Sequence, residues 1–153
     1  MSAYADTSLL CALYRKQVNS ERAIAAQARL GEPLRVTRLL VWEFRQSARF
    51  QAFRFSNDRT VGYRLKQAEA MISKLDEHIL QGKWILEQCD LLAVLTHAER
   101  ISRNQTPSGG HRSLDVLHVA TAVELGVREF LSFDANQNRL ARSEGMATPL
   151  EEF

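Results

Sequence analysis

Short apolar segments alternate with helical segments along the whole chain, and this alternation constrains the fold more than any other feature. The strand candidates are residues 2–5, 34–37, 84–86 with 91–92, 129–133, and a short final segment near 146–148. Helical periodicity covers residues 7–16, 21–30, 38–55, 59–80, 95–104, 113–125 and 136–143. Strands separated by helices form a parallel sheet with helices on both faces, so the sequence predicts an α/β fold.

The length of 153 residues suits a single domain, 1–153, with one sizeable core. The first residues lack the basic and apolar regions of a signal peptide, and no apolar run approaches the ~20 residues of a membrane span. Cys11 and Cys89 lie in apolar segments without metal-ligand spacing, which argues against a zinc site and for reduced packing residues. The sequence therefore predicts a cytoplasmic protein.

Four carboxylates stand in or beside apolar runs instead of on charged faces: Asp6, Glu43, Asp115 and Asp134. A carboxylate removed from water is costly unless it is paired, hydrogen-bonded or bound to a metal. Asp6 and Asp134 close predicted strands, and ligands of open α/β sheets bind at the carboxyl ends of the strands. Four acids that met at this edge would repel one another and require a cation.

Each aspartate also has a local, structural explanation. Asp6 can cap the helix after the first strand, and Asp134 can cap the last helix, with Gln137 completing a capping box. Asp115 would lie in the first turn of the helix over residues 113–125, where the helix dipole favours an acid. Any of the three could therefore be purely structural.

Glu43 is harder to explain locally because it lies inside a helix, between Trp42 and Phe44, which suggest that the segment is largely enclosed. A surface position remains open if the helix turns that face outward. His118 lies one turn after Asp115 and is either a core histidine with its hydrogen bonds satisfied or a residue beside the site. No nucleophile elbow and no phosphate-binding glycine loop occurs.

The net charge of +2 is too small to demonstrate nucleic-acid binding, but its distribution is uneven. One stretch of 27 residues carries six arginines, and Glu43 is its only acid before residue 58: Arg38, Arg45, Arg49, Arg54, Arg59 and Arg64. A phosphate-bearing partner fits this stretch, although a solvated face is the commoner explanation of scattered arginines.

Four segments, in this order, resemble the PIN domain family and in particular the VapC-type toxins of bacterial toxin–antitoxin pairs. They are YADTS at 4–8, VWE at 41–43, RSLDVLHVATA at 112–122 and FLSFD at 130–134. The third segment is the most specific. Together the four segments span nearly the whole chain.

The resemblance implies an α/β/α sandwich whose central parallel sheet gathers acids around Mg²⁺ or Mn²⁺. It places Asp6, Glu43, Asp115 and Asp134 on the catalytic, metal-binding positions. Hydroxyls of Thr7 or Ser8 and of Ser132 fall where neighbouring hydroxyls often order the site. It also implies endoribonuclease activity, inhibition by a small antitoxin protein, and homodimers. The helical pair around residues 38–81 would form a projection that antitoxins and partner subunits use.

Mg²⁺ is a hard ion that takes oxygen ligands and keeps several waters, so a few carboxylates plus a substrate phosphate suit it independently of the resemblance. Two other functions stay open. One is a catalytically weak RNA- or protein-binding PIN module, and the other is a DNA nuclease.

Overall fold

The computed structural model describes residues 3–151. Ser2, with which the first predicted strand begins, and both ends of the predicted domain lie outside the described residues. In chain order the elements are β1 (Ala3–Ala5), α1 (Thr7–Tyr14), α2 (Ser20–Leu30), β2 (Leu34–Thr37), α3 (Arg38–Asn57), α4 (Leu65–Leu80), β3 (Trp84–Glu87), α5 (Leu91–Gly109), α6 (Ser113–Glu124), β4 (Glu129–Leu131) and α7 (Ala135–Ser143).

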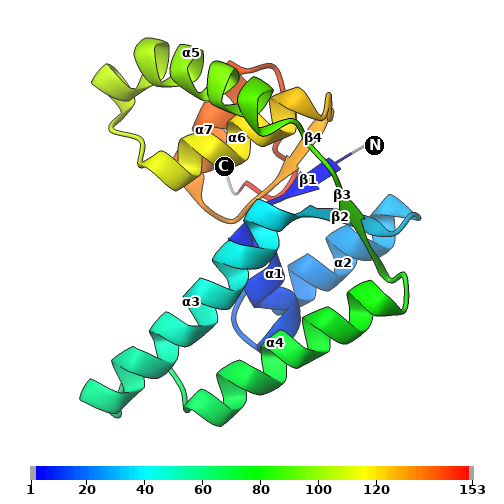
Figure 1. Cartoon of the computed structure of the whole chain (residues 1–153), viewed down its shortest axis with the longest axis vertical. Coiled ribbons are helices and arrows are strands. Elements are labelled where there is room, and N and C mark those ends of the chain that lie inside the picture. Colours follow the sequence, from blue (N-terminus) through cyan, green and yellow to red (C-terminus); the bar gives the residue numbers. More distant parts are fainter. Residues whose placement is uncertain (1–2, 152–153) are drawn as a thin grey trace.

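The strands are all parallel and form two pairs that lie side by side. β1 pairs with β4, with Tyr4 opposite Phe130, and β2 pairs with β3, with Leu34 opposite Trp84. β1 also contacts β2, so the pairs form a central layer in the order β3, β2, β1, β4 (Figure 1). The expected strand near 146–148 is reduced to one bridge between Glu129 and Ala147.

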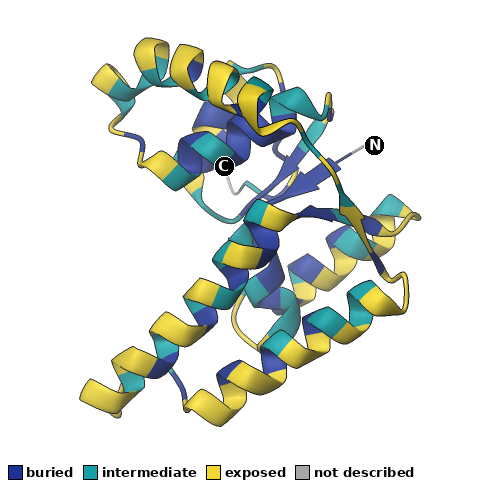
Figure 2. Cartoon of the chain, in the orientation of Figure 1, coloured by how far each residue is buried: buried dark blue, intermediate teal, exposed yellow. Residues whose placement is uncertain are grey.

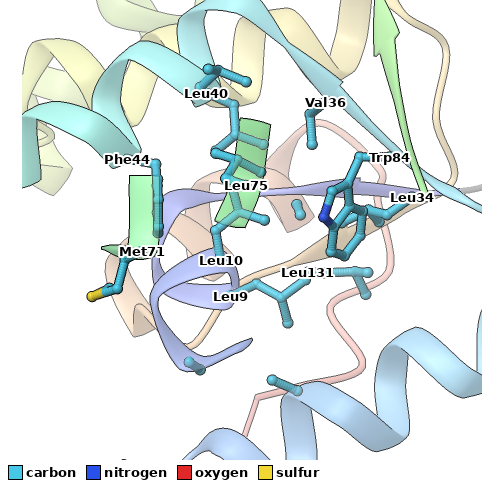
Figure 3. Packing of buried hydrophobic residues seen from close by; sticks show 14 of the residues in the cluster. Leu9, Leu10, Leu34, Val36, Leu40, Phe44, Met71, Leu75, Trp84 and Leu131 are labelled. Atoms are coloured by element: carbon cyan, nitrogen blue, oxygen red, sulfur yellow. The ribbon is translucent and has the colours of Figure 1, made fainter. Parts of the chain in front are cut away.

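Alternate residues of the strands feed two hydrophobic cores, one on each face of the sheet. Ala3, Ala5 and Leu131 belong to the first core, which α1 to α4 cover, whereas Tyr4 and Phe130 belong to the second, which α5 to α7 cover. Figure 3 shows the first core, where leucines of α1 pack between α3, α4 and the sheet. The predicted α/β/α sandwich is therefore confirmed.

Helices α3 and α4 pack on each other and extend away from the sheet as an antiparallel pair (Figure 1). Their connection is tight at Gly62, which has a φ of 69°; a Cβ there would lie 2.1 Å from the carbonyl oxygen of Gln51. The helix predicted to begin at residue 59 begins at Leu65 instead, because this turn occupies the intervening residues.

Two predictions around α5 are wrong. Leu91 and Leu92, expected in a strand, start α5, because the carboxylate of Asp90 accepts hydrogen bonds from the backbone N–H groups of Leu92 and Ala93. The helix predicted over residues 95–104 is also too short at its C-terminal end, because α5 continues through Pro107 to Gly109. Among the described residues, no helix is long and apolar enough to cross a membrane.

The burial of the segment around Glu43 is mixed. Phe44 is fully buried, but the side chain of Trp42 is exposed, so the expectation of an enclosed segment holds only for one neighbour of Glu43.

Cys11 and Cys89 are free and partly buried, and burial raises the pKa of the Cys11 thiol to about 11. Figure 2 shows β1, β2 and β4 largely buried between helices whose outer faces are exposed, whereas β3 is largely exposed.

Candidate active site

Each strand leads within three residues into a helix whose first turn is capped by a side chain. Asp6 caps α1, Thr37 caps α3, Asp90 caps α5 and Asp134 caps α7. Four helix N-termini therefore meet the carboxyl edge of the sheet, where their unpaired N–H groups favour anions. The capping roles of Asp6 and Asp134 are confirmed, but the Gln137 side chain does not complete a capping box, because its buried Oε1 has no partner among the described atoms.

Asp6 is the most enclosed of the four acids, with 1% of its surface exposed. Its Oδ1 accepts from the Leu9 backbone at 3.2 Å and from the Ser8 hydroxyl at 2.6 Å, and its Oδ2 accepts from the Ser132 hydroxyl at 2.6 Å. Burial raises the pKa of Asp6, because the hydrogen bonds from the two serines and the nearby His118 offset the loss of water only in part.

The two serines also bind the backbone that follows β4. Ser8 Oγ accepts from Phe133 N and Ser132 Oγ accepts from Asp134 N, both at 2.9 Å. The Asn138 side chain donates to the Ser132 carbonyl oxygen at 3.0 Å. These bonds fix Asp134 relative to Asp6. Asn138 was not selected from the sequence.

Glu43 accepts two hydrogen bonds on its Oε2, from the Thr7 hydroxyl and from His118 Nε2. His118 is fully buried, and its Nδ1 lies 2.8 Å from the Tyr4 hydroxyl, which is also 3.4 Å from Thr37 Oγ1. Because the ionised Glu43 carboxylate only accepts, His118 Nε2 carries the hydrogen that faces it. His118 is a core residue whose two ring nitrogens both have partners, and it also lies beside the site. Both interpretations of His118 that the sequence allowed therefore apply.

The pKa of Glu43 reflects opposing effects. Partial burial would raise it, but the hydrogen bond and charge of His118, the Thr7 hydroxyl and the charge of Arg112 together hold the pKa below its ordinary value. Glu43 is thus ionised and fixed in position. Tyr4 was not selected from the sequence, and nothing in a strand tyrosine signals such a contact. His118 carries a signal, since a residue three positions after Asp115 shares its helix face.

Asp115 lies in the first turn of α6, nearly buried, with its Oδ2 3.2 Å from Arg112 Nε. The same guanidinium reaches Asp134, with 4.0 Å between Nη2 and Oδ2. Asp115 raises the pKa of Arg112, whose side chain is 79% exposed. The exposed guanidinium of Arg112 therefore lies between Asp115 and Asp134. It also interacts electrostatically with Glu43.

These contacts place all four predicted acids around one edge of the sheet. Their carboxylate oxygens are the donors that a hard divalent cation prefers, so the donor chemistry fits Mg²⁺ or Mn²⁺. In residues 3–151, however, no three His, Cys, Asp or Glu side chains form a group that could hold a metal ion. Oε2 of Glu43 faces His118 instead, and Oδ2 of Asp115 faces Arg112.

Residues 3–143 match the family model described as PIN domain. The chain belongs to the PIN domain family. PIN domains are generally metal-dependent nucleases and typically use divalent metal ions, so family membership supports a hydrolase that cleaves phosphodiester bonds. A search of curated proteins gave no match.

Proposed function

We propose that this PIN domain is an Mg²⁺- or Mn²⁺-dependent endoribonuclease of the VapC type, the toxin of a toxin–antitoxin pair. The observation that carries the proposal is the meeting of Asp6, Glu43, Asp115 and Asp134 at one edge of the sheet of a PIN domain. When bound there, a divalent ion supplies a nucleophilic water at neutral pH and neutralises charge on the phosphate.

The role proposed for each residue follows from its burial and its contacts. Asp6 and Asp115 are the main ligands, because they are the two most enclosed acids. Glu43 would hold the ion or a proton from a water beside it, and His118 and Thr7 orient its carboxylate. Asp134 lies farther out and serves a second ion or the outer shell. Arg112, which is largely exposed beside the acids, binds a phosphate of the RNA.

The partners follow from the same proposal. A small antitoxin protein and a second copy of the chain bind the base of the projecting pair α3–α4, at its apolar groove. Arg38, Trp42, Leu86 and Leu91 line this groove. A small open reading frame directly upstream of the coding sequence would favour the toxin over a housekeeping nuclease.

The test compares the wild type with Asp115→Asn on a mixed RNA pool, in Mg²⁺, in Mn²⁺ and in EDTA. Outer-shell changes at metal sites cost about 10–100-fold, so loss of a direct ligand should slow cleavage at least about 100-fold. The wild type should cleave with either ion and not in EDTA. Asp90→Asn is the matched control, because Asp90 caps a helix at the same sheet edge without contacting the four acids.

Equal cleavage by wild type and Asp115→Asn would remove the catalytic assignment and leave a binding module. A single-stranded DNA pool is run in parallel, and preferential cleavage of DNA would replace the ribonuclease with a DNA nuclease.

A further inference from the structure

The face of α3 that carries Glu43 continues away from the site as an exposed stripe. Gln46, Phe50, Phe53 and Asn57 follow Glu43 at intervals of three and four residues, which places them on one side of the helix. Phe50 is 52% exposed and Phe53 61% exposed. Their rings stack, with centroids 6.1 Å apart and planes inclined by 28°. The stripe therefore presents an aromatic pair to solvent.

This pair does not contribute to the core. The opposite side of α3 makes the core contacts, through residues that include Phe44, Ala48 and Ala52, which are all buried. Two phenylalanines left in water on a helix that already has a complete apolar face indicate an interaction surface.

The charge around the pair is positive. Arg49 and Arg54 are exposed beside Phe50 and Phe53, and no acid occurs between Glu43 and Asp58. Among the ion pairs of the described residues, none involves Arg49 or Arg54, whereas Arg45, farther round the helix, pairs with Asp76. At the end of the projection, Arg59 and Arg64 lie over the ring of Phe55.

We propose that this stripe is a track for single-stranded RNA, in which Phe50 and Phe53 stack on bases and Arg49 and Arg54 bind the flanking phosphates. Aromatic rings interleaved with cations are how proteins hold single strands without reading sequence. With a helical rise of 1.5 Å per residue, Phe50 and Phe53 lie roughly 10 and 15 Å along α3 from Glu43. RNA on the track would therefore extend from the cleaved bond toward the tip of the projection.

RNA suits this surface better than a protein partner does. A protein would have to bring acids to neutralise both arginines and apolar residues to cover both rings, whereas a single strand supplies phosphates and bases alternately along its length. The link between the track and cleavage rests on the proposed function, but RNA binding by the track does not.

The test measures binding of a fluorescent 12-nucleotide single-stranded RNA in EDTA, where no metal-dependent cleavage occurs. Phe50→Leu with Phe53→Leu keeps apolar side chains but removes both rings. Stacking is worth about 1–3 kcal/mol per base, so the double variant should bind at least about tenfold more weakly. Arg49→Gln with Arg54→Gln should also weaken binding, and the slope of log K against log salt should fall by about 1.4, or about 0.7 for each lost phosphate contact.

The matched control is Leu92→Ala with Arg103→Gln, which removes an exposed apolar residue and an exposed arginine from α5. This control should bind RNA as the wild type does. Light scattering on all variants reports whether the chain self-associates through the stripe.

Unchanged RNA affinity of the phenylalanine variant would overturn the proposal, as would absence of RNA binding by the wild type. A loss of dimer mass in that variant with RNA affinity retained would make the stripe a protein interface and would also overturn it. Failure of the proposed function looks different: the wild type would bind RNA through the stripe and cleave none of it when Mg²⁺ is added.

Discussion

The carboxylate of Asp6 has two oxygens, and the first turn of α1 uses only one of them. A carboxylate offers about four acceptor positions, so one side chain can cap a helix and still face a ligand. The same holds for Asp134, whose Oδ1 caps α7 while its Oδ2 faces Arg112. Capping and a role in the site are thus compatible at these positions, although the local sequence presents them as competing explanations.

We expect Asp6→Asn to be more stable than the wild type at neutral pH in EDTA. The pKa of Asp6 is raised in the folded state by burial. As pH rises above about 4, the unfolded chain loses this proton first, so the free energy of unfolding of the wild type falls until the pH reaches the raised pKa. Asparagine keeps the capping oxygen and does not titrate, so its advantage should grow over this range.

Urea denaturation at several pH values, in EDTA, measures this difference. Adding Mg²⁺ should raise the stability of the wild type and have less effect on Asp6→Asn, since a ligand that binds only the folded state stabilises it. A variant less stable than the wild type across the whole pH range would mean that Asp6 acts mainly as a cap.

The four acids could be selected from the sequence because carboxylates in apolar company are unusual. The bonds that orient them could not. Tyr4 acts through a contact with His118, far away in the sequence, and such a contact depends on how α6 packs on the sheet. Asn138 lies only six residues after Ser132, but its bond depends on the path of the backbone between β4 and α7. The pairing of Asp115 with Arg112 could have been predicted from the sequence, because residues three apart on a helix are neighbours.

At the scale of the elements, α6 shows what periodicity can predict and α5 what it cannot. α6 is apolar on most sides, and its predicted span of 113–125 differs from the structure by one residue. Leu91 and Leu92 were misassigned because two adjacent leucines have no periodicity, and the structure leaves both of them exposed. The turn before α4 was missed because its geometry depends on contact with α3.

We expect Gly62→Ala to open the α3–α4 pair. The new Cβ would meet the Gln51 carbonyl oxygen at 2.1 Å, and the φ of 69° is unfavourable for alanine. Left-handed geometry alone costs roughly 1–2 kcal/mol, so the clash should bring the total to more than about 2 kcal/mol.

Gly82→Ala is the matched control, because Gly82 has a similar φ of 72° but nothing within 4 Å of its Cβ position. Thermal unfolding of both variants separates the two costs. Equal destabilisation of the two variants would show that the contact between the new Cβ at position 62 and Gln51 adds nothing to the cost of the left-handed backbone.

On the scale of the whole molecule, the two cores share the strands, since neighbouring residues of β1 and β4 point to opposite faces. A substitution that destabilises one core should therefore also destabilise the other. A sheet with strands of only three or four residues has little stability without both helical layers.

We expect Leu140→Ala, in the core beneath α5 to α7, to lower the stability of the entire chain by about 2–5 kcal/mol, because Leu140 is buried. Trp84 lies in the other core and reports on it by fluorescence, in a Trp42→Phe background that removes the exposed tryptophan. The fluorescence and circular dichroism transitions in urea should shift together. A shift in circular dichroism alone would mean that the two layers unfold separately.

The connections at the two edges of the sheet differ in what they can tolerate. At the carboxyl edge one residue separates β1 from α1, and none separates β2 from α3. Extra residues there would displace a cap and a carboxylate together. The opposite edge, at residues 31–33, 81–83 and 125–128, carries the turns that lead into β2, β3 and β4. Inserted segments and new chain termini can therefore be accommodated on that side, and the chain could gain length or fusion partners without disturbing its chemistry.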